Sequence, residues 1–193
     1  MERAFLKCGA TALALTLSGC AAGGAGTSAR TAGGVDVARF HLGEQTIARG
    51  QIAIEAFDRA DANRPEFSVY ANAVARQLAR LGWTVVPGTT RTEQVALIDV
   101  EQGSRQAIGA LASARVGRSV AASVQADAPN VTATLLEVGI RRRSDATVFW
   151  EGRAVGEGRT GSAEAASQAA VERLATALFR DFPGESGRTI RVK

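Results

Sequence analysis

Apolar and polar residues alternate along several short stretches of this chain, and a period of two predicts strands with one buried face. These stretches are residues 35–42, 51–57, 83–86, 95–102, 131–142 and 147–155, followed by the short run 189–192. The residues that we expect to face inward in two of them are Ala38, Phe40 and Leu42 in 35–42, and Val148, Trp150 and Ala154 in 147–155. The chain therefore contains enough strands for one sizeable sheet.

Two other segments repeat apolar residues at steps of three and four, which is typical of amphipathic helices. The first starts near Pro65 and ends at Gly82, and its stripe is Phe67, Tyr70, Ala71, Val74, Leu78 and Leu81. The second starts near Ser162, a plausible N-cap, and its stripe is Val171, Leu174, Ala175, Leu178 and Phe182. Both segments are long enough to cover one face of a sheet.

The order of these elements defines the fold class that we predict. Strands that do not alternate regularly with helices favour an α+β fold, with a mostly antiparallel sheet and two amphipathic helices packed on one face. Residues 35–193 then form a single domain. Residues 103–129 show no clear periodicity, so we expect a long low-complexity excursion with short strand pieces at most.

The N-terminus carries the most specific signal. Arg3 and Lys7 precede an apolar run at 8–17, which is too short for a bilayer span of roughly 20 residues. Residues 17–20 (LSGC) resemble the lipobox of a bacterial lipoprotein, which implies a signal peptide over 1–19, cleavage between Gly19 and Cys20, and acylation of Cys20. The alternative is an ordinary secretory signal that is cleaved elsewhere and leaves Cys20 free.

The lipobox resemblance also implies a location. A diacylglyceryl thioether and an N-acyl chain such as palmitate on Cys20 hold a protein firmly on a lipid bilayer. Ala21 stands where inner-membrane retention signals carry Asp, which implies sorting to the outer membrane of a Gram-negative bacterium, with the domain in the periplasm. Residues 20–34 are small and polar and are typical of a flexible tether.

Composition narrows the function classes. Cys8 leaves with the signal, so a disulfide framework, a zinc–cysteine cluster or a thiol nucleophile is not expected in the mature chain. The net charge is +4, but only 5% of residues are aromatic and the chain is predicted to be exported, so we expect no nucleic-acid partner.

Several segments together resemble a known family. They are Glu66–Ala71 (EFSVYA), Arg80–Trp83 (RLGW), Trp150–Gly152 (WEG) and Phe179–Gly184 (FRDFPG). In this order they resemble the bacterial lipoproteins catalogued as domain of unknown function 4136, over roughly residues 35–192. The resemblance implies an envelope lipoprotein but no activity, cofactor or catalytic residue.

Candidate chemistry is sparse. Residues 156–161 match G-x-G-x-x-G, but Glu157 would face a pyrophosphate, and a flexible strand-to-helix turn is the simpler interpretation. His41 is expected to face solvent. Asp99 and Glu101 share a strand face and form either an acid–base pair or a solvated strand end.

A run of three arginines, Arg141, Arg142 and Arg143, lies at a predicted hairpin end. These guanidinium groups could bind the phosphates of lipid A or of anionic phospholipid; the alternative is a solvated hairpin tip. The oxygen-bearing side chains Asp58, Asp61 and Asn63 do not have the spacing of an EF-hand loop. We expect no metal and no cofactor.

The sequence therefore predicts an envelope lipoprotein without enzymatic activity, which binds a protein partner or supports an envelope complex. The alternative is a carrier or sensor for a lipid or glycan of the envelope, held between the sheet and residues 103–129. A hydrolase that uses His41, Asp99 and Glu101 is the third hypothesis, and we rank it last.

Overall fold

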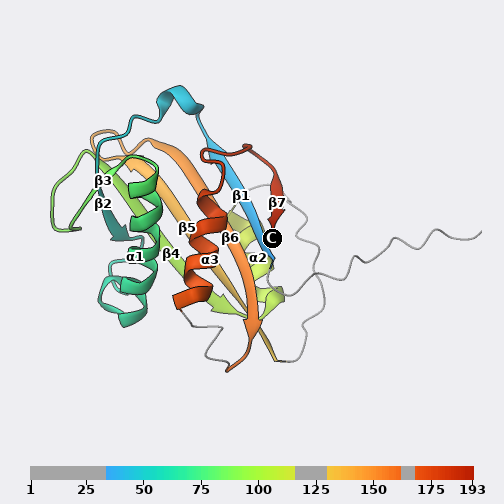
Figure 1. Cartoon of the computed structure of the whole chain (residues 1–193). Coiled ribbons are helices and arrows are strands. Elements are labelled where there is room, and N and C mark those ends of the chain that lie inside the picture. The colour runs from blue at the N-terminus through green and yellow to red at the C-terminus, as the bar shows by residue number, and fades with distance from the viewer. Residues whose placement is uncertain (1–33, 116–129, 162–167) are drawn as a thin grey trace, which may run out of the picture.

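A single sheet organises the computed structural model, which describes residues 34–115, 130–161 and 168–193 (Figure 1). The predicted signal, its cleavage site and the lipidated cysteine lie outside the described residues, as does Ser162. The strands are β1 (Val35–His41), β2 (Gln51–Ala56), β3 (Thr84–Val86), β4 (Gln94–Gly103), β5 (Val131–Arg142), β6 (Val148–Arg159) and β7 (Thr189–Val192).

The spatial order of the strands is β3-β2-β4-β5-β6-β1-β7. Strand β2 runs parallel to both β3 and β4, and the other neighbouring pairs are antiparallel. The α+β prediction is confirmed, with a mixed sheet in which antiparallel pairs predominate. The parallel pair β2–β3 is joined through helix α1 (Pro65–Arg80), as a parallel connection requires a crossover.

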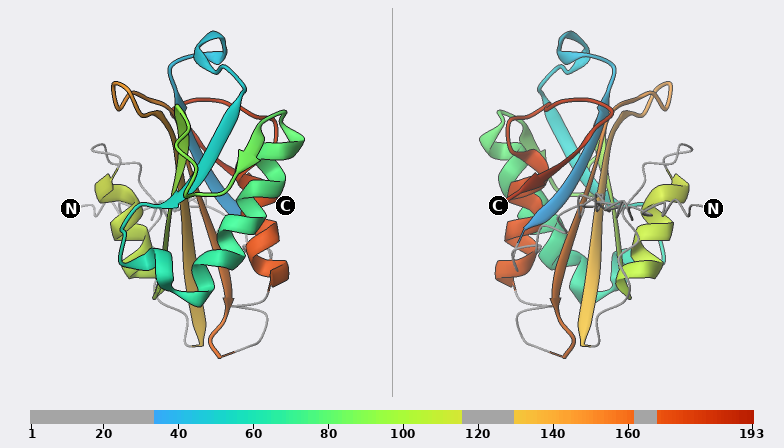
Figure 2. Two further views of the ribbon diagram at one scale, coloured as in Figure 1. Left: turned by 90° about the vertical axis from the view of Figure 1, so that its left-hand side faces the viewer. Right: turned by 90° about the vertical axis from the view of Figure 1, so that its right-hand side faces the viewer.

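Helices cover both faces of the sheet, although unequally. Helices α1 and α3 (Gln168–Phe179) lie side by side on one face, and helix α2 (Arg105–Arg115) lies on the opposite face (Figure 2). We call the side under α1 and α3 the inner face, and the other side the outer face. Short 3₁₀ turns at Glu44–Thr46 and Asp61–Asn63 complete the described elements.

Helix α2 corrects the expectation that 103–129 is an excursion without helix. Ser104 starts this helix, because its Oγ accepts a hydrogen bond from the N–H of Ala107 at 3.2 Å. Only Ile108 and Leu111 pack from it onto the sheet. A stripe of two apolar residues is too short to show periodicity, so the pattern missed the helix.

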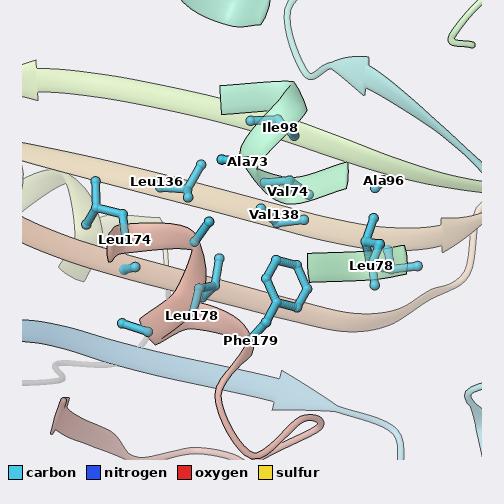
Figure 3. Close-up of a cluster of buried hydrophobic side chains, with 14 of the residues drawn as sticks. Ala73, Val74, Leu78, Ala96, Ile98, Leu136, Val138, Leu174, Leu178 and Phe179 are labelled. Atoms are coloured by element: carbon cyan, nitrogen blue, oxygen red, sulfur yellow. The ribbon is translucent and has the colours of Figure 1, made fainter. Parts of the chain in front are cut away.

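The inner face holds the main core (Figure 3). Leu136 and Val138 of β5 pack against Leu78 of α1 and against Leu174 and Leu178 of α3. Both predicted helical stripes supply this core, and Phe182 packs on it after α3 ends. The two tryptophans are also buried in this core, as expected.

The predicted face of the first strand is wrong. Val35, Val37 and Arg39 point into the inner face, while Leu42 is 62% exposed. The reason is Arg39, whose Nε and Nη2 donate to the carbonyls of Leu178 and Ala177 at 2.8 Å each. A guanidinium thus satisfies carbonyls at the end of α3 that have no partner within the helix. Burial lowers the pKa of Arg39, and the charge of Asp181 partly opposes this shift.

Strand β6 also departs from strict alternation. A register shift beside Ile140 and Arg141 adds one residue to β6, so that Phe149 and Trp150 both contribute to the inner core. Val148 is therefore turned to the outer face, contrary to the prediction, and is 46% exposed. A β-bulge of this kind re-aims side chains without ending the strand.

Candidate functional site

The outer face is the candidate site, because helix α2 covers only one end of it. There Ile108 packs on Ala133 and Leu135. The ion pair of Arg105 with Glu157, with Nε and Oε1 at 2.7 Å, joins α2 to strand β6. The rest of this face carries no described helix (Figure 2).

A groove of about 110 Å³ lies on the part of the outer face that α2 leaves open. Its lining side chains come from β4, β5 and β6 and from the end of β2, and they are Phe57, Leu97, Asp99, Glu137, Arg141, Val148 and Glu151. Phe57 is 69% exposed. Phe57 and Val148 line this groove. Together with Leu42, which follows the end of β1, they are the large hydrophobic residues that are exposed in the described part of the chain.

A cluster of charges lies beside these apolar residues. Arg153 places its Nε 3.2 Å from Oε2 of Glu137 and also forms an ion pair with Glu151. The Arg153 side chain is only 7% exposed, and a buried charge is tolerated where it is paired in this way. The strand register places Asp99 directly opposite Glu137.

The carboxyl of Glu151 is electrostatically unusual. Burial raises its pKa above the ordinary value, the Arg153 guanidinium opposes this shift, and Glu137 adds to it. Perturbed carboxyls of this kind mark candidate functional sites, and they also occur in structural ion-pair networks. Here the partner is a neighbouring side chain on the same strand.

The structure separates the three predicted arginines. Arg142 pairs with Asp145 at 2.9 Å, and Arg143 pairs with Glu55 of β2. Arg141 lines the outer groove, where its Nε is buried without a hydrogen-bond partner among the described residues. Two of the three guanidinium groups are therefore engaged by carboxylates of this chain. Hydrogen bonds from Thr147 to Asp145, more than the charge of Arg142, lower the pKa of Asp145.

The G-x-G-x-x-G match does not form the expected strand-to-helix turn. Strand β6 runs on to Arg159, so Gly156 and Gly158 are strand residues. A Cβ on Gly156 would lie 2.9 Å from Leu174 of α3, and this glycine therefore allows close packing between helix and sheet. Glu157 pairs with Arg105.

The other sequence candidates are dispersed. His41 is half-buried and not fully turned to solvent, as its Nε2 lies 3.0 Å from the carbonyl oxygen of Gly184. Asp99 lies in the outer groove, and Glu101 lies in a separate pocket beside α1. Asp58 accepts a hydrogen bond from Ala60, and Asp61 pairs with Arg64. Within the described ranges, no group of three or more His, Cys, Asp or Glu side chains could hold a metal ion.

Sequence reasoning missed Phe57, Glu137, Glu151 and Arg153 as members of one surface. The available signal was the predicted hairpin between 131–142 and 147–155. Once its strands are paired, Glu137 lies opposite Arg153, and Glu151 is two residues from Arg153 on the same face. None of the described helices is both long and apolar enough to cross a membrane.

Comparisons with known proteins assign this chain to no family. No family model matches it. An uncharacterized protein of Zymomonas mobilis is 26% identical, and the match covers 82% of this chain and 80% of that protein. The resemblance to domain of unknown function 4136 therefore stays a prediction.

Solved structures show the fold alone. A PDZ domain protein from Parabacteroides distasonis is similar with a TM-score of 0.50 and 11% identity, covering 85% of this chain and 40% of that one. A candidate lipoprotein from Caulobacter crescentus is similar with a TM-score of 0.31 and 13% identity, covering 65% of this chain and 80% of that one. Neither likeness assigns an activity to this chain.

Proposed function

We propose that this chain is a lipid-anchored envelope protein that binds a protein partner through its outer sheet face and has no enzymatic activity of its own. The observation that carries the proposal is the placement of Phe57 and Val148, two exposed large hydrophobic residues of the described chain, in one groove beside a paired charge cluster. Apolar residues that are exposed together mark interaction sites more often than single ones do.

The chemistry of the face describes the partner. The groove contains the carboxylates Asp99, Glu137 and Glu151, and against them stand the guanidinium groups of Arg141 and Arg153. This set therefore contains one more carboxylate than guanidinium groups. A protein segment that presents apolar side chains with at least one basic side chain complements this surface.

Lipid anchoring completes the proposal and rests on the lipobox. Acylated Cys20 would hold the domain at the outer membrane through a tether that ends at Gly34, and the domain would lie in the periplasm. Cys20→Ser should release the protein from membranes and abolish labelling by palmitate. A membrane fraction unchanged in Cys20→Ser cells would contradict the anchor.

Photo-crosslinking in cells tests the partner surface. A photoreactive residue at Phe57 or Val148 should capture one envelope protein reproducibly, and the same residue at Ala79, exposed on α1, should not. The double variant Phe57→Ser, Val148→Ser should lose capture from a photoreactive residue at Leu97, which lines the same groove, with a change in unfolding free energy within about 0.5 kcal/mol per surface site. Capture that persists in the double variant, or that is equal at Ala79, would sink the proposal.

The carrier hypothesis remains a prediction. Helix α2 packs directly on Ala133 and Leu135, which narrows the space predicted between the sheet and 103–129, and residues 116–129 lie outside the described part. Native mass spectrometry of gently extracted protein tests it, since a carrier should retain a lipid or glycan.

A further inference from the structure

A second surface lies on the opposite side of the sheet from the outer face, beside helix α3. A groove of about 420 Å³ runs between α3 and the paired ends of β1 and β7. Val35, Ala177 and Val192 supply its apolar lining, and Arg173, Arg180 and Lys193 supply basic side chains. Val35 and Val192 are partners in the strand ladder, so the groove lies where β1 begins and β7 ends. These two strands lie side by side in Figure 1.

The basic side chains of the groove come from α3, from the residue after it and from the end of β7. Arg173 and Ala177 are four residues apart on α3 and so share one side of the helix. Arg180 follows directly after the helix ends at Phe179, and it lines the same groove. Arg173 forms no ion pair with any described residue. Arg180 has only a surface pair with Asp181, at 3.7 Å, and such pairs are weak.

The single carboxylate in the groove is already engaged. Glu172 forms an ion pair with Arg76 of α1. The groove therefore combines an apolar lining with an excess of basic side chains over acidic ones. Guanidinium groups match the geometry of phosphate oxygens, and the apolar lining suits the carbon chain that follows a phospholipid headgroup.

The position of the groove decides between possible anions. Under the anchoring proposed above, residues 21–34 link the lipid on Cys20 to Val35 at the edge of the groove. The flexible tether that the sequence predicts here would span about 20 Å on average. The groove would thus stay close to the bilayer surface, where phospholipid phosphates are concentrated.

We propose that the groove between α3 and β7 binds the phosphate headgroups of an anionic phospholipid surface and so orients the domain on its membrane. This inference rests on the proposed lipid anchor and adds a second contact to it. The outer face, across the sheet, would then be turned toward a partner while α3 and β7 contact the bilayer.

Vesicle binding tests the inference apart from the anchor. The mature chain 20–193 with Cys20→Ser contains every described element and carries no lipid. It should bind vesicles of equal parts phosphatidylglycerol and phosphatidylcholine, and not vesicles of phosphatidylcholine alone. In this background, Arg173→Gln with Arg180→Gln should lower the partition coefficient roughly 30-fold, which corresponds to about 1 kcal/mol per basic residue.

Arg80→Gln with Arg91→Gln is the matched control. It removes the same charge, but these exposed arginines lie near the opposite edge of the sheet, beside α1 and β3. Vesicle binding should change little in this control. An equal loss in both double variants would show that only net charge matters and would overturn the inference.

A fluorescent label provides an independent readout. The Cys20→Ser chain from residue 20 onward has no other cysteine, so Thr176→Cys places one label in the groove and Ala79→Cys places one on α1. Only the groove label should shift to the blue with anionic vesicles. Equal shifts of the two labels would overturn the inference. It would also be overturned if the Arg173→Gln, Arg180→Gln variant still bound anionic vesicles but lost a crosslinked protein, because the groove would then bind an acidic protein segment.

The two proposals fail separately. If the Cys20→Ser protein stays on membranes in cells without palmitate, the proposed anchor is refuted. The vesicle experiment still tests the groove in that case. If Cys20→Ser releases the protein from cell membranes, but the released form does not bind anionic vesicles, the anchor is supported and the groove proposal is refuted.

Discussion

The two faces of the sheet are built from the same strands and differ in what they bury. Along β5, Leu136 and Val138 pack under α1 and α3, whereas Glu137 between them joins the charge cluster of the outer face. Helix α2 shields only the end of the outer face near Leu135. The comparison teaches that the inner face holds most of the folding energy and that the open part of the outer face is available for binding.

Removing an inner-face side chain should have the largest effect. Leu178→Ala deletes a fully buried side chain and should lower the unfolding free energy by about 2–5 kcal/mol. Leu111→Ala, on the partly buried side of α2, should cost about 1 kcal/mol. Urea denaturation of both variants measures the difference, and equal losses would show that the two faces contribute alike.

The buried arginine of the inner face should have the next largest effect. Arg39→Met leaves the carbonyls of Ala177 and Leu178 without their donor and should cost about 2 kcal/mol. Arg191→Met on neighbouring β7 removes a partly exposed ion pair with Asp36 and should cost about 1 kcal/mol. Chemical denaturation compares them, and a smaller loss for Arg39→Met would refute its capping role.

The smallest effect is a pH dependence on the outer face. Because the pKa of Glu151 is raised, the folded state binds more protons than the unfolded state just above the ordinary glutamate range. The contribution of Glu151 to the unfolding free energy should therefore fall as pH rises through that range. Glu151→Gln should flatten this fall, by about 0.5 kcal/mol or less. Denaturation midpoints across the acid range measure it, and parallel profiles for the two proteins would contradict the raised pKa.

Local patterns predicted most of the elements. Strand β5 occupies the predicted residues, β7 is the predicted short edge strand, and both amphipathic stripes form helices on one face. Helix α2 was missed because only two of its side chains pack on the sheet. The parallel pairs of β2 were also missed, since alternation does not encode which strands become neighbours.

The candidate site was the least predictable part. Arg141 and Asp99 do line one groove. The other residues that line it include Glu137 of β5, Glu151 of β6 and Phe57, which follows β2. In the sequence alone, each of these residues looks like an ordinary solvent-exposed residue of a strand. Their common face emerges only from the strand register and from the bulge that turns Val148 outward.

The sequence by itself determined the class of fold, because helical and extended backbones impose periods of about 3.6 and 2 residues on any buried surface. It also contains residues 17–20, whose resemblance to a lipobox is local to a few residues. Only the tertiary structure decided which face of β1 is buried, since Arg39 bonds carbonyls 139 and 138 positions away. Contacts between such distant residues depend on how whole elements pack, and no local pattern records them.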